Sequence, residues 1–138
     1  MINHEEKAHE LFKQGYNCAQ SVFAAFCDVT GIDFETAIKL TSGFGAGMGG
    51  MTETCGAISG AVAIMGFVMS DGMENPKTKG QTYKLSREIA KRFGEKNTTT
   101  VCGTLKGIGS DKGPLRSCPG CIDDAVEIAC DMLKQLAE

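Results

Sequence analysis

The chain has 138 residues, of which 42% are hydrophobic and 22% charged. This length and composition are typical of one soluble globular domain, so we expect residues 1–138 to fold as a single domain with its own core. The net charge of −3 at pH 7 excludes the strongly basic surface that neutralises phosphates, and we expect no nucleic-acid partner.

Hydrophobic residues recur at helical spacing along most of the chain, and no segment shows the period-2 alternation of a half-buried strand. In chain order, the predicted helices cover about residues 4–14, 18–29, 34–40, 54–69, 77–94 and 118–137, with a short turn at 102–105. Asn3, Asn17 and Asp33 are placed as N-caps, while Gly31 and Gly94 are placed as stops. We therefore predict an all-α fold, a single compact bundle of about six helices with a Gly-rich loop.

The Gly-rich loop covers residues 43–50, where five of eight residues are glycine. Its letters match the dinucleotide fingerprint G-x-G-x-x-G, but that fingerprint follows a strand, and residues 37–42 are predicted to be helical. We therefore expect a loop that packs over a nearby site and lets the backbone approach it closely.

The fourth predicted helix is apolar, and Met65, Met69 and Met73 form a stripe at helical spacing. Core filling is the favoured explanation of this stripe, and a homodimer interface is the alternative. The uncharged segment 54–70 is 17 residues long and includes polar residues, so it is too short and too polar to span a membrane.

Seven cysteines are many for this length, but the odd number and the size of the chain argue against a disulfide-stapled scaffold. The N-terminal segment is acidic and polar, without the features of a signal or transit peptide. We therefore expect a cytoplasmic protein with reduced thiols, in which clustered cysteines indicate metal or redox chemistry.

The cysteines divide by their place in the predicted helices. Four lie in the first turn of a helix or helical turn: Cys18, Cys55, Cys102 and Cys118. Free backbone N–H groups and the helix dipole favour a thiolate at such positions. Cys27 and Cys130 face away from this first group and are expected to be buried hydrophobes. Cys121 shares a helix face with Cys118, and three roles remain open for it: a further ligand, a resolving thiol or a core residue.

The residues around these cysteines resemble a known family. The segments Gly15-Tyr16-Asn17-Cys18-Ala19-Gln20 and Cys55-Gly56-Ala57-Ile58-Ser59-Gly60, followed by Cys102 and Cys118, are similar to the C_GCAxxG_C_C family. Its members are small proteins of about this length that are described as redox-active and have four signature cysteines. A similar module occurs in split-Soret cytochromes, which are dimeric and carry an iron–sulfur cluster as well as haem.

The resemblance implies that Cys18, Cys55, Cys102 and Cys118 are cluster ligands or redox thiols. The sequence has no Cys-x-x-Cys-His segment, so the haem part of the resemblance does not apply. Cys121 lies outside the family's four-cysteine pattern, which leaves both Cys118 and Cys121 as candidates for the last ligand.

Three functions fit these cysteines. The leading hypothesis is an iron–sulfur protein, with a [2Fe–2S] or [4Fe–4S] cluster, that transfers electrons to a redox partner the sequence does not identify. The second is a thiol–disulfide oxidoreductase or redox sensor that uses the C-x-x-C pair Cys118 and Cys121, with Cys55 or Cys102 as further candidates. The third is a structural zinc domain with four thiolate ligands and no catalysis.

The two histidines, His4 and His9, lie on the first predicted helix, and we expect both to face solvent. With no other histidine in the sequence, acid–base catalysis centred on histidine has little support.

Overall fold

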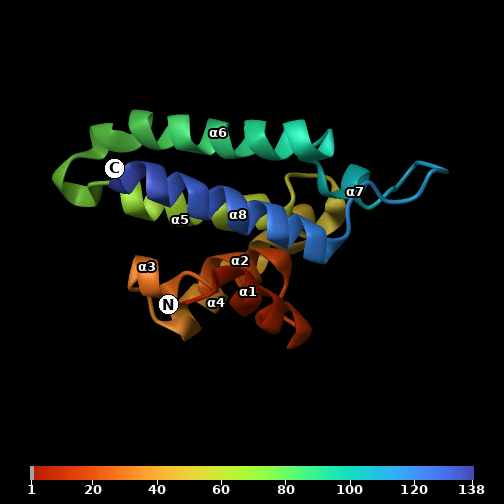
Figure 1. Cartoon of the computed structure of the whole chain (residues 1–138), viewed down its shortest axis with the longest axis horizontal. Helices are drawn as coiled ribbons and strands as arrows, with labels where there is room; N and C mark the ends of the chain where they lie inside the picture. The colour runs from red at the N-terminus through yellow and green to blue at the C-terminus, as the bar shows by residue number, and fades with distance from the viewer. Residues whose placement is uncertain (1) are drawn as a thin grey trace.

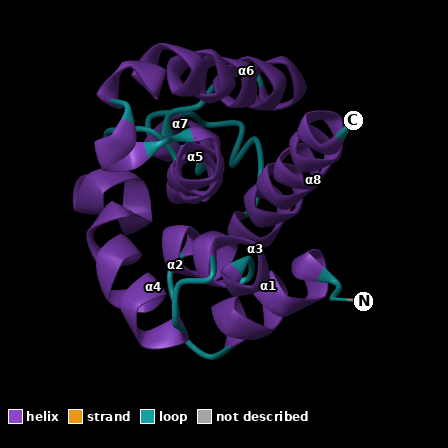
Figure 2. Ribbon diagram, turned by 90° about the vertical axis from the view of Figure 1, so that its left-hand side faces the viewer, coloured by secondary structure: helices purple, strands orange, loops and turns teal. Residues whose placement is uncertain are grey.

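The computed structural model describes residues 2–138, and most of them are helical. The helices are α1 (His4–Lys13), α2 (Cys18–Ala24), α3 (Cys27–Thr30), α4 (Phe34–Thr41), α5 (Gly56–Met69), α6 (Lys79–Asn97), α7 (Cys102–Leu105) and α8 (Cys118–Ala137). No strand forms among the described residues; a single antiparallel bridge joins Thr54 to Val101. The predicted all-α fold is confirmed (Figure 2).

Helix α5 lies at the centre of this fold. Figure 1 shows α6 on one side of it and α1 to α4 on the other, and Figure 2 shows α8 alongside it. None of its residues is charged, and half of them are buried. The buried residues are Gly56, Ala57, Ile58, Gly60, Ala61, Ile64 and Met65. Because an apolar helix of this kind is stable only when neighbours cover it, α5 forms the axis of the core.

Only part of the methionine stripe belongs to this core. Met65 is 1% exposed, whereas Met73, beyond the end of α5, is fully exposed. The core explanation therefore holds for the first methionine and fails for the last.

Several helix ends follow the sequence signals. Asn3, Asn17 and Asp33 each accept a hydrogen bond from the backbone N–H three residues later. Asn17 and Gln20 complete a reciprocal capping box at the start of α2. Gly31 ends α3 with φ 75°, the left-handed conformation that favours glycine at this position.

The sequence predicts one continuous helix over residues 18–29. This prediction was wrong, because the segment forms two helices, α2 and α3. The chain leaves helical geometry at Phe26, with φ −108° and ψ 24°, and begins α3 at Cys27. The Phe26 ring is fully buried and stacks on His4, with ring centroids 4.1 Å apart. Burying this ring against another helix is a tertiary effect, which helical periodicity does not show.

Helix α6 continues three residues beyond Gly94, where the sequence predicted its end. The Asn97 side chain donates hydrogen bonds to the Phe93 carbonyl and, at 2.9 Å, to the Asp124 carboxylate on α8. This contact with α8 holds the last turn of α6 in helical form.

The Gly-rich segment forms two short turns, Ser42–Phe44 and Gly47–Met51, rather than an open loop. A Cβ added at Gly47, which has φ 54°, would lie 2.4 Å from the Cys102 Cβ. The segment therefore packs tightly over Cys102, and only glycine fits at this position.

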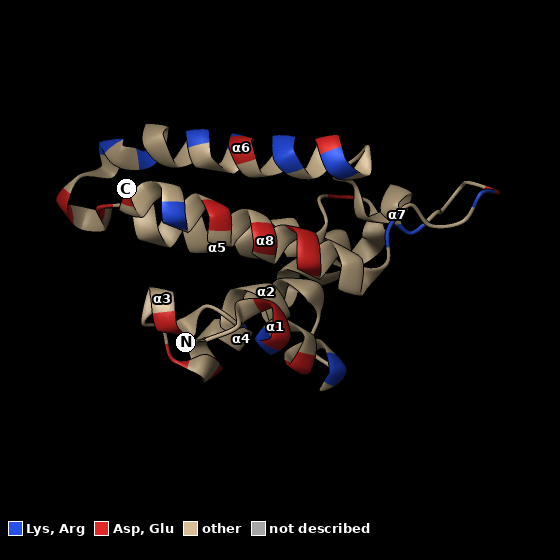
Figure 3. Ribbon diagram, in the orientation of Figure 1, with Lys and Arg blue, Asp and Glu red and all other residues tan. Residues whose placement is uncertain are grey.

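Charges are distributed over the outer surface. Figure 3 shows Lys and Arg along α6 and Asp and Glu along the neighbouring α8. Within residues 2–138, no helix has the length and apolar character needed to cross a bilayer.

Candidate functional site

Four cysteines from separate parts of the chain line one cavity of about 200 Å³. They are Cys18, Cys55, Cys102 and Cys118. Three of them are buried and Cys118 is half-buried, and all seven cysteines of the chain carry free thiols. The rest of the wall is formed by Phe12, Asn17, Ala46, Met51, Gly56 and Lys106. The structure thus brings together the four sulfurs that the sequence singled out.

Each of the four cysteines stands at the start of a helix, as the sequence predicts. Cys18, Cys102 and Cys118 are the first residues of α2, α7 and α8, and Cys55 directly precedes α5. At such positions the first backbone N–H groups have no partner within the helix and are free to donate to sulfur. The N–H groups of Ala57 and Ile58 favour the thiolate form of Cys55 in this way and lower its pKa, although its side chain makes no cap hydrogen bond of standard geometry.

Backbone pairing joins the Cys55 segment to the Cys102 segment. The Cys55 N–H donates to the Thr100 carbonyl, and the Cys102 N–H donates to the Glu53 carbonyl, both at 2.8 Å. These two bonds flank the Thr54–Val101 bridge. They fix two cavity cysteines side by side through the main chain, independently of the side chains.

Close packing of small residues brings Cys18 next to Cys55. A Cβ added at Gly60 would lie 2.9 Å from the Ala19 carbonyl oxygen, and one at Gly56 would lie 3.2 Å from the Ala19 nitrogen. Glycine at these two positions lets α5 approach α2 where Ala19, the neighbour of Cys18, lies. The Cys-Gly-Ala-x-x-Gly segment is therefore a helix-packing face as well as part of the cysteine site.

An ion-pair network positions the segment that leads to Cys118. Asp124 is 1% exposed and accepts hydrogen bonds from Arg116 at 3.1 Å and from Asn97 at 2.9 Å. Lys96 lies 2.8 Å from its other oxygen. Together with the Ser117 cap, which accepts from the Gly120 N–H, this network anchors the first turn of α8.

The thiols around the cavity differ in acidity. A hydrogen bond from the Cys121 thiol, together with the backbone N–H groups of Ala57 and Ile58 and the charge of Lys106, lowers the pKa of Cys55 to about 6, against the effect of burial. The hydrogen bond to Cys55, together with burial, raises the pKa of Cys121. Burial and neighbouring cysteines raise the pKa values of Cys18 and Cys102. The surroundings of Cys55 therefore favour its thiolate form.

Lys106 places a positive charge against these sulfurs. Its Nζ atom is buried and makes no hydrogen bond of standard geometry. Burial alone lowers the pKa of this amine, but the neighbouring Cys118, Cys121 and Cys18 outweigh that effect and raise it. Lys106 was not predicted from the sequence; its position four residues after Cys102, on the same side of a helical turn, was the available signal.

The three other cysteines lie outside the cavity wall. Cys121 is fully buried and contacts Cys55 from behind, so Cys118 is the member of the C-x-x-C pair that faces the cavity. Cys27 and Cys130 are only half-buried, so the expectation that both are buried hydrophobes overstated their burial.

The expectation that both histidines face solvent overstated their exposure. The His4 side chain is 18% exposed and interacts with Asp28 at 3.0 Å. The His9 side chain is 30% exposed and contacts Asp123 on α8. Both contacts join residues far apart in the sequence, which the position of a histidine on one helix does not reveal.

Comparison with known proteins gives one family and one relative. Residues 16–132 match the family described as "Putative redox-active protein (C_GCAxxG_C_C)". A protein of Archaeoglobus fulgidus, described as an uncharacterized protein, is 28% identical over 142 residues, covering 94% of this chain and 93% of its own length. No solved structure matches the chain.

Proposed function

The chain belongs to the C_GCAxxG_C_C family, and from this premise we propose that Cys18, Cys55, Cys102 and Cys118 hold an iron–sulfur cluster for electron transfer to a redox partner protein. The observation that carries the proposal is the buried Lys106 amine, which makes no hydrogen bond of standard geometry and lies against the cysteines at the cavity. A buried cation requires nearby negative charge, and four thiolates holding a metal centre supply it.

The residues present fit such a group. Four thiolate sulfurs are the ordinary ligands of [2Fe–2S] and [4Fe–4S] clusters. The cavity of about 200 Å³ is several times larger than the roughly 30 Å³ that one water occupies in the liquid. Its wall combines apolar side chains with one amine, which limits access of water to the sulfurs.

A bound cluster supplies one-electron oxidation and reduction, and the chain's own residues set the surroundings. The Ala57 and Ile58 N–H groups and the Cys121 thiol lower the pKa of Cys55 and so stabilise negative charge on that sulfur. Lys106 acts in the same direction by its charge. Phe12 and Met51 cover the cavity on its apolar side.

Metal analysis under strict exclusion of oxygen tests the proposal. Protein purified anaerobically, or reconstituted with iron and sulfide, is expected to be brown and to contain iron and acid-labile sulfide. Replacing a cavity cysteine, Cys55→Ser or Cys102→Ser, is expected to lower the iron content strongly. The matched control is Cys27→Ser, which changes a half-buried cysteine outside the cavity and should retain the cluster. Wild-type protein that stays colourless and iron-free after reconstitution would contradict the proposal.

Two further outcomes of that experiment identify the other candidate functions. Stoichiometric zinc without iron identifies a structural zinc site on the same cysteines, because zinc is redox-inert. A metal-free protein with a reversible two-electron disulfide identifies a thiol–disulfide couple. If the protein is a thiol–disulfide couple, the contact between the Cys55 thiolate and the Cys121 thiol favours a disulfide between Cys55 and Cys121 over one between Cys118 and Cys121. In it, Cys55 attacks a substrate disulfide and displaces one thiolate, and Cys121 then attacks the mixed disulfide and displaces the second.

A further inference from the structure

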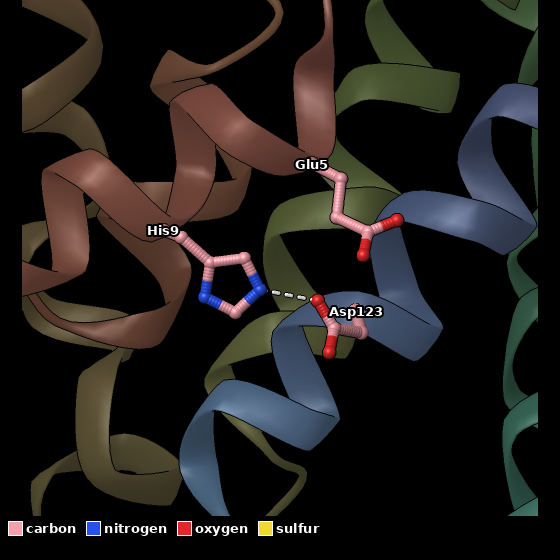
Figure 4. Close-up of side chains that lie close together, drawn as sticks. All are labelled: Glu5, His9 and Asp123. Carbon is pink, nitrogen blue, oxygen red and sulfur yellow. Dashed lines mark hydrogen bonds and ion pairs between the residues drawn. The ribbon is translucent and has the colours of Figure 1, made fainter.

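A second cluster of metal-ligand side chains lies between α1 and α8, away from the cysteine cavity. Glu5 and His9 stand one helical turn apart on α1, and Asp123 faces them from α8 (Figure 4). One ligand atom from each residue lies within 4.8 Å of the other two. The His9 Nε2 atom contacts the Asp123 carboxylate directly. Figure 4 shows all three side chains pointing toward one another.

No lysine or arginine pairs with the two carboxylates of this cluster. Among residues 2–138, no Lys or Arg forms an ion pair with Glu5 or Asp123, and Arg116 pairs with Asp124 instead. Burial and the adjacent Asp123 carboxylate raise the pKa of Glu5. When two carboxylates lie close together without a cation, the charge of each disfavours the ionised form of the other.

An imidazole nitrogen and two carboxylate oxygens form a ligand set for a divalent cation. Carboxylates suit Mn²⁺, and the imidazole suits Zn²⁺ and other first-row ions. The His9 and Asp123 side chains are 30% and 34% exposed, so an ion from solvent reaches the cluster without unfolding the chain. Three protein ligands leave further coordination positions to water.

We propose that Glu5, His9 and Asp123 bind a divalent first-row transition-metal ion and so bridge α1 to α8. None of the three residues lines the cysteine cavity, and their ligand atoms are nitrogen and oxygen rather than sulfur. Soft thiolates select iron–sulfur clusters or zinc, whereas the oxygen-rich set on α1 and α8 accepts harder ions that thiolates bind poorly. One small chain thus offers two metal sites with different selectivity.

Titration of the full chain with Mn²⁺ tests this site, because the preference of Mn²⁺ for oxygen and nitrogen keeps it away from the cysteines. Electron paramagnetic resonance reports free Mn²⁺, and we expect one ion bound per chain. Glu5→Gln and His9→Gln should each weaken binding by about tenfold or more. The matched controls Glu10→Gln and Asp131→Asn, at exposed positions on the same two helices, should leave it unchanged. Zn²⁺ should displace the bound Mn²⁺, following the general order of affinity.

Three results would overturn the inference. Wild-type protein that binds no Mn²⁺ at about 1 mM shows that the cluster is not a metal site. Equal weakening by Glu5→Gln and Glu10→Gln shows only general attraction to an acidic surface. Loss of Mn²⁺ binding in Cys118→Ser but not in Glu5→Gln places the ion in the cysteine cavity. Glu5→Gln leaves the contact between His9 and Asp123 in place, so circular dichroism of this variant should match the wild type.

Discussion

The contact between α2 and α5 offers the sharpest test of how the cysteine site is built. Substituting Gly60→Ala adds a Cβ that would lie 2.9 Å from the Ala19 carbonyl oxygen and 3.1 Å from the Val22 Cβ. Neither neighbour is the flexible end of a side chain, so the two helices must separate. Gly66, in the same helix, is the matched control, since a Cβ there would lie 3.5 Å from Thr82 Cγ2, an ordinary van der Waals distance.

The expected magnitude follows from two opposing effects. Replacing glycine by alanine inside a helix stabilises it by about 0.5–1 kcal/mol, and this gain applies equally to both positions. Overpacking a close contact costs about 1–3 kcal/mol, and this cost applies only to Gly60→Ala. The helix-propensity gain cancels in the comparison, so Gly60→Ala should be less stable than Gly66→Ala by about 1–3 kcal/mol.

Urea unfolding followed by circular dichroism measures this difference, provided that both variants have the same m value. The iron content of the folded Gly60→Ala protein should also fall, because Ala19 and Gly56 directly follow Cys18 and Cys55 in the sequence. Equal free energies of unfolding for the two variants would refute the argument that small residues at the helix crossing set the cysteine geometry.

Two other predictions concern charged side chains. Hydrogen bonds from Lys96, Asn97 and Arg116 lower the pKa of Asp124, against the effect of burial. Its contribution to stability is therefore present above its unfolded pKa of about 3.9 and is lost as the pH falls through the lower folded value. Asp124→Asn should reduce the free energy of unfolding at pH 7 by about 1–3 kcal/mol, with the difference from wild type shrinking at about pH 3; an unchanged difference would contradict this. Lys106→Met removes the charge that helps to lower the pKa of Cys55, so thiolate absorbance in the metal-free protein should appear at higher pH than in wild type. The same titration of Lys112→Met, changed at an exposed position, should match the wild type.

Local signals predicted the part of the fold that depends on helix ends. Asn17, Asp33 and Gly31 occupy the capping positions expected of them, because caps act within one turn of the chain. For the same reason, the position of four cysteines at helix starts followed from sequence. Their convergence did not, because it depends on the approach of α2 to α5 and on the backbone bonds between the Cys55 and Cys102 segments.

The features that sequence missed are contacts between residues far apart in the chain. The Phe26 ring, where the helix is interrupted, stacks on the ring of His4, and His9 contacts Asp123, more than a hundred residues away. Periodicity assigns each residue to a face of its own helix but does not say which neighbour covers that face. A histidine on an amphipathic helix therefore looks solvent-facing until the opposing helix is placed.

At the cysteine site, helical periodicity likewise does not distinguish the surroundings of Cys118 from those of Cys121. Helical spacing puts them on one face, yet only Cys118 lines the cavity, while Cys121 is fully buried and contacts Cys55. Cys118 stands at the entry to α8, where the Ser117 cap and the pairing of Arg116 with Asp124 set the direction of the chain. Cys121 lies one turn deeper and donates to the Cys55 sulfur. A hydrogen bond of this kind stabilises negative charge on a ligand sulfur without occupying a coordination position. The fifth cysteine near the site is thus compatible with a four-cysteine ligand set, in a role that supports Cys55 rather than competes with it.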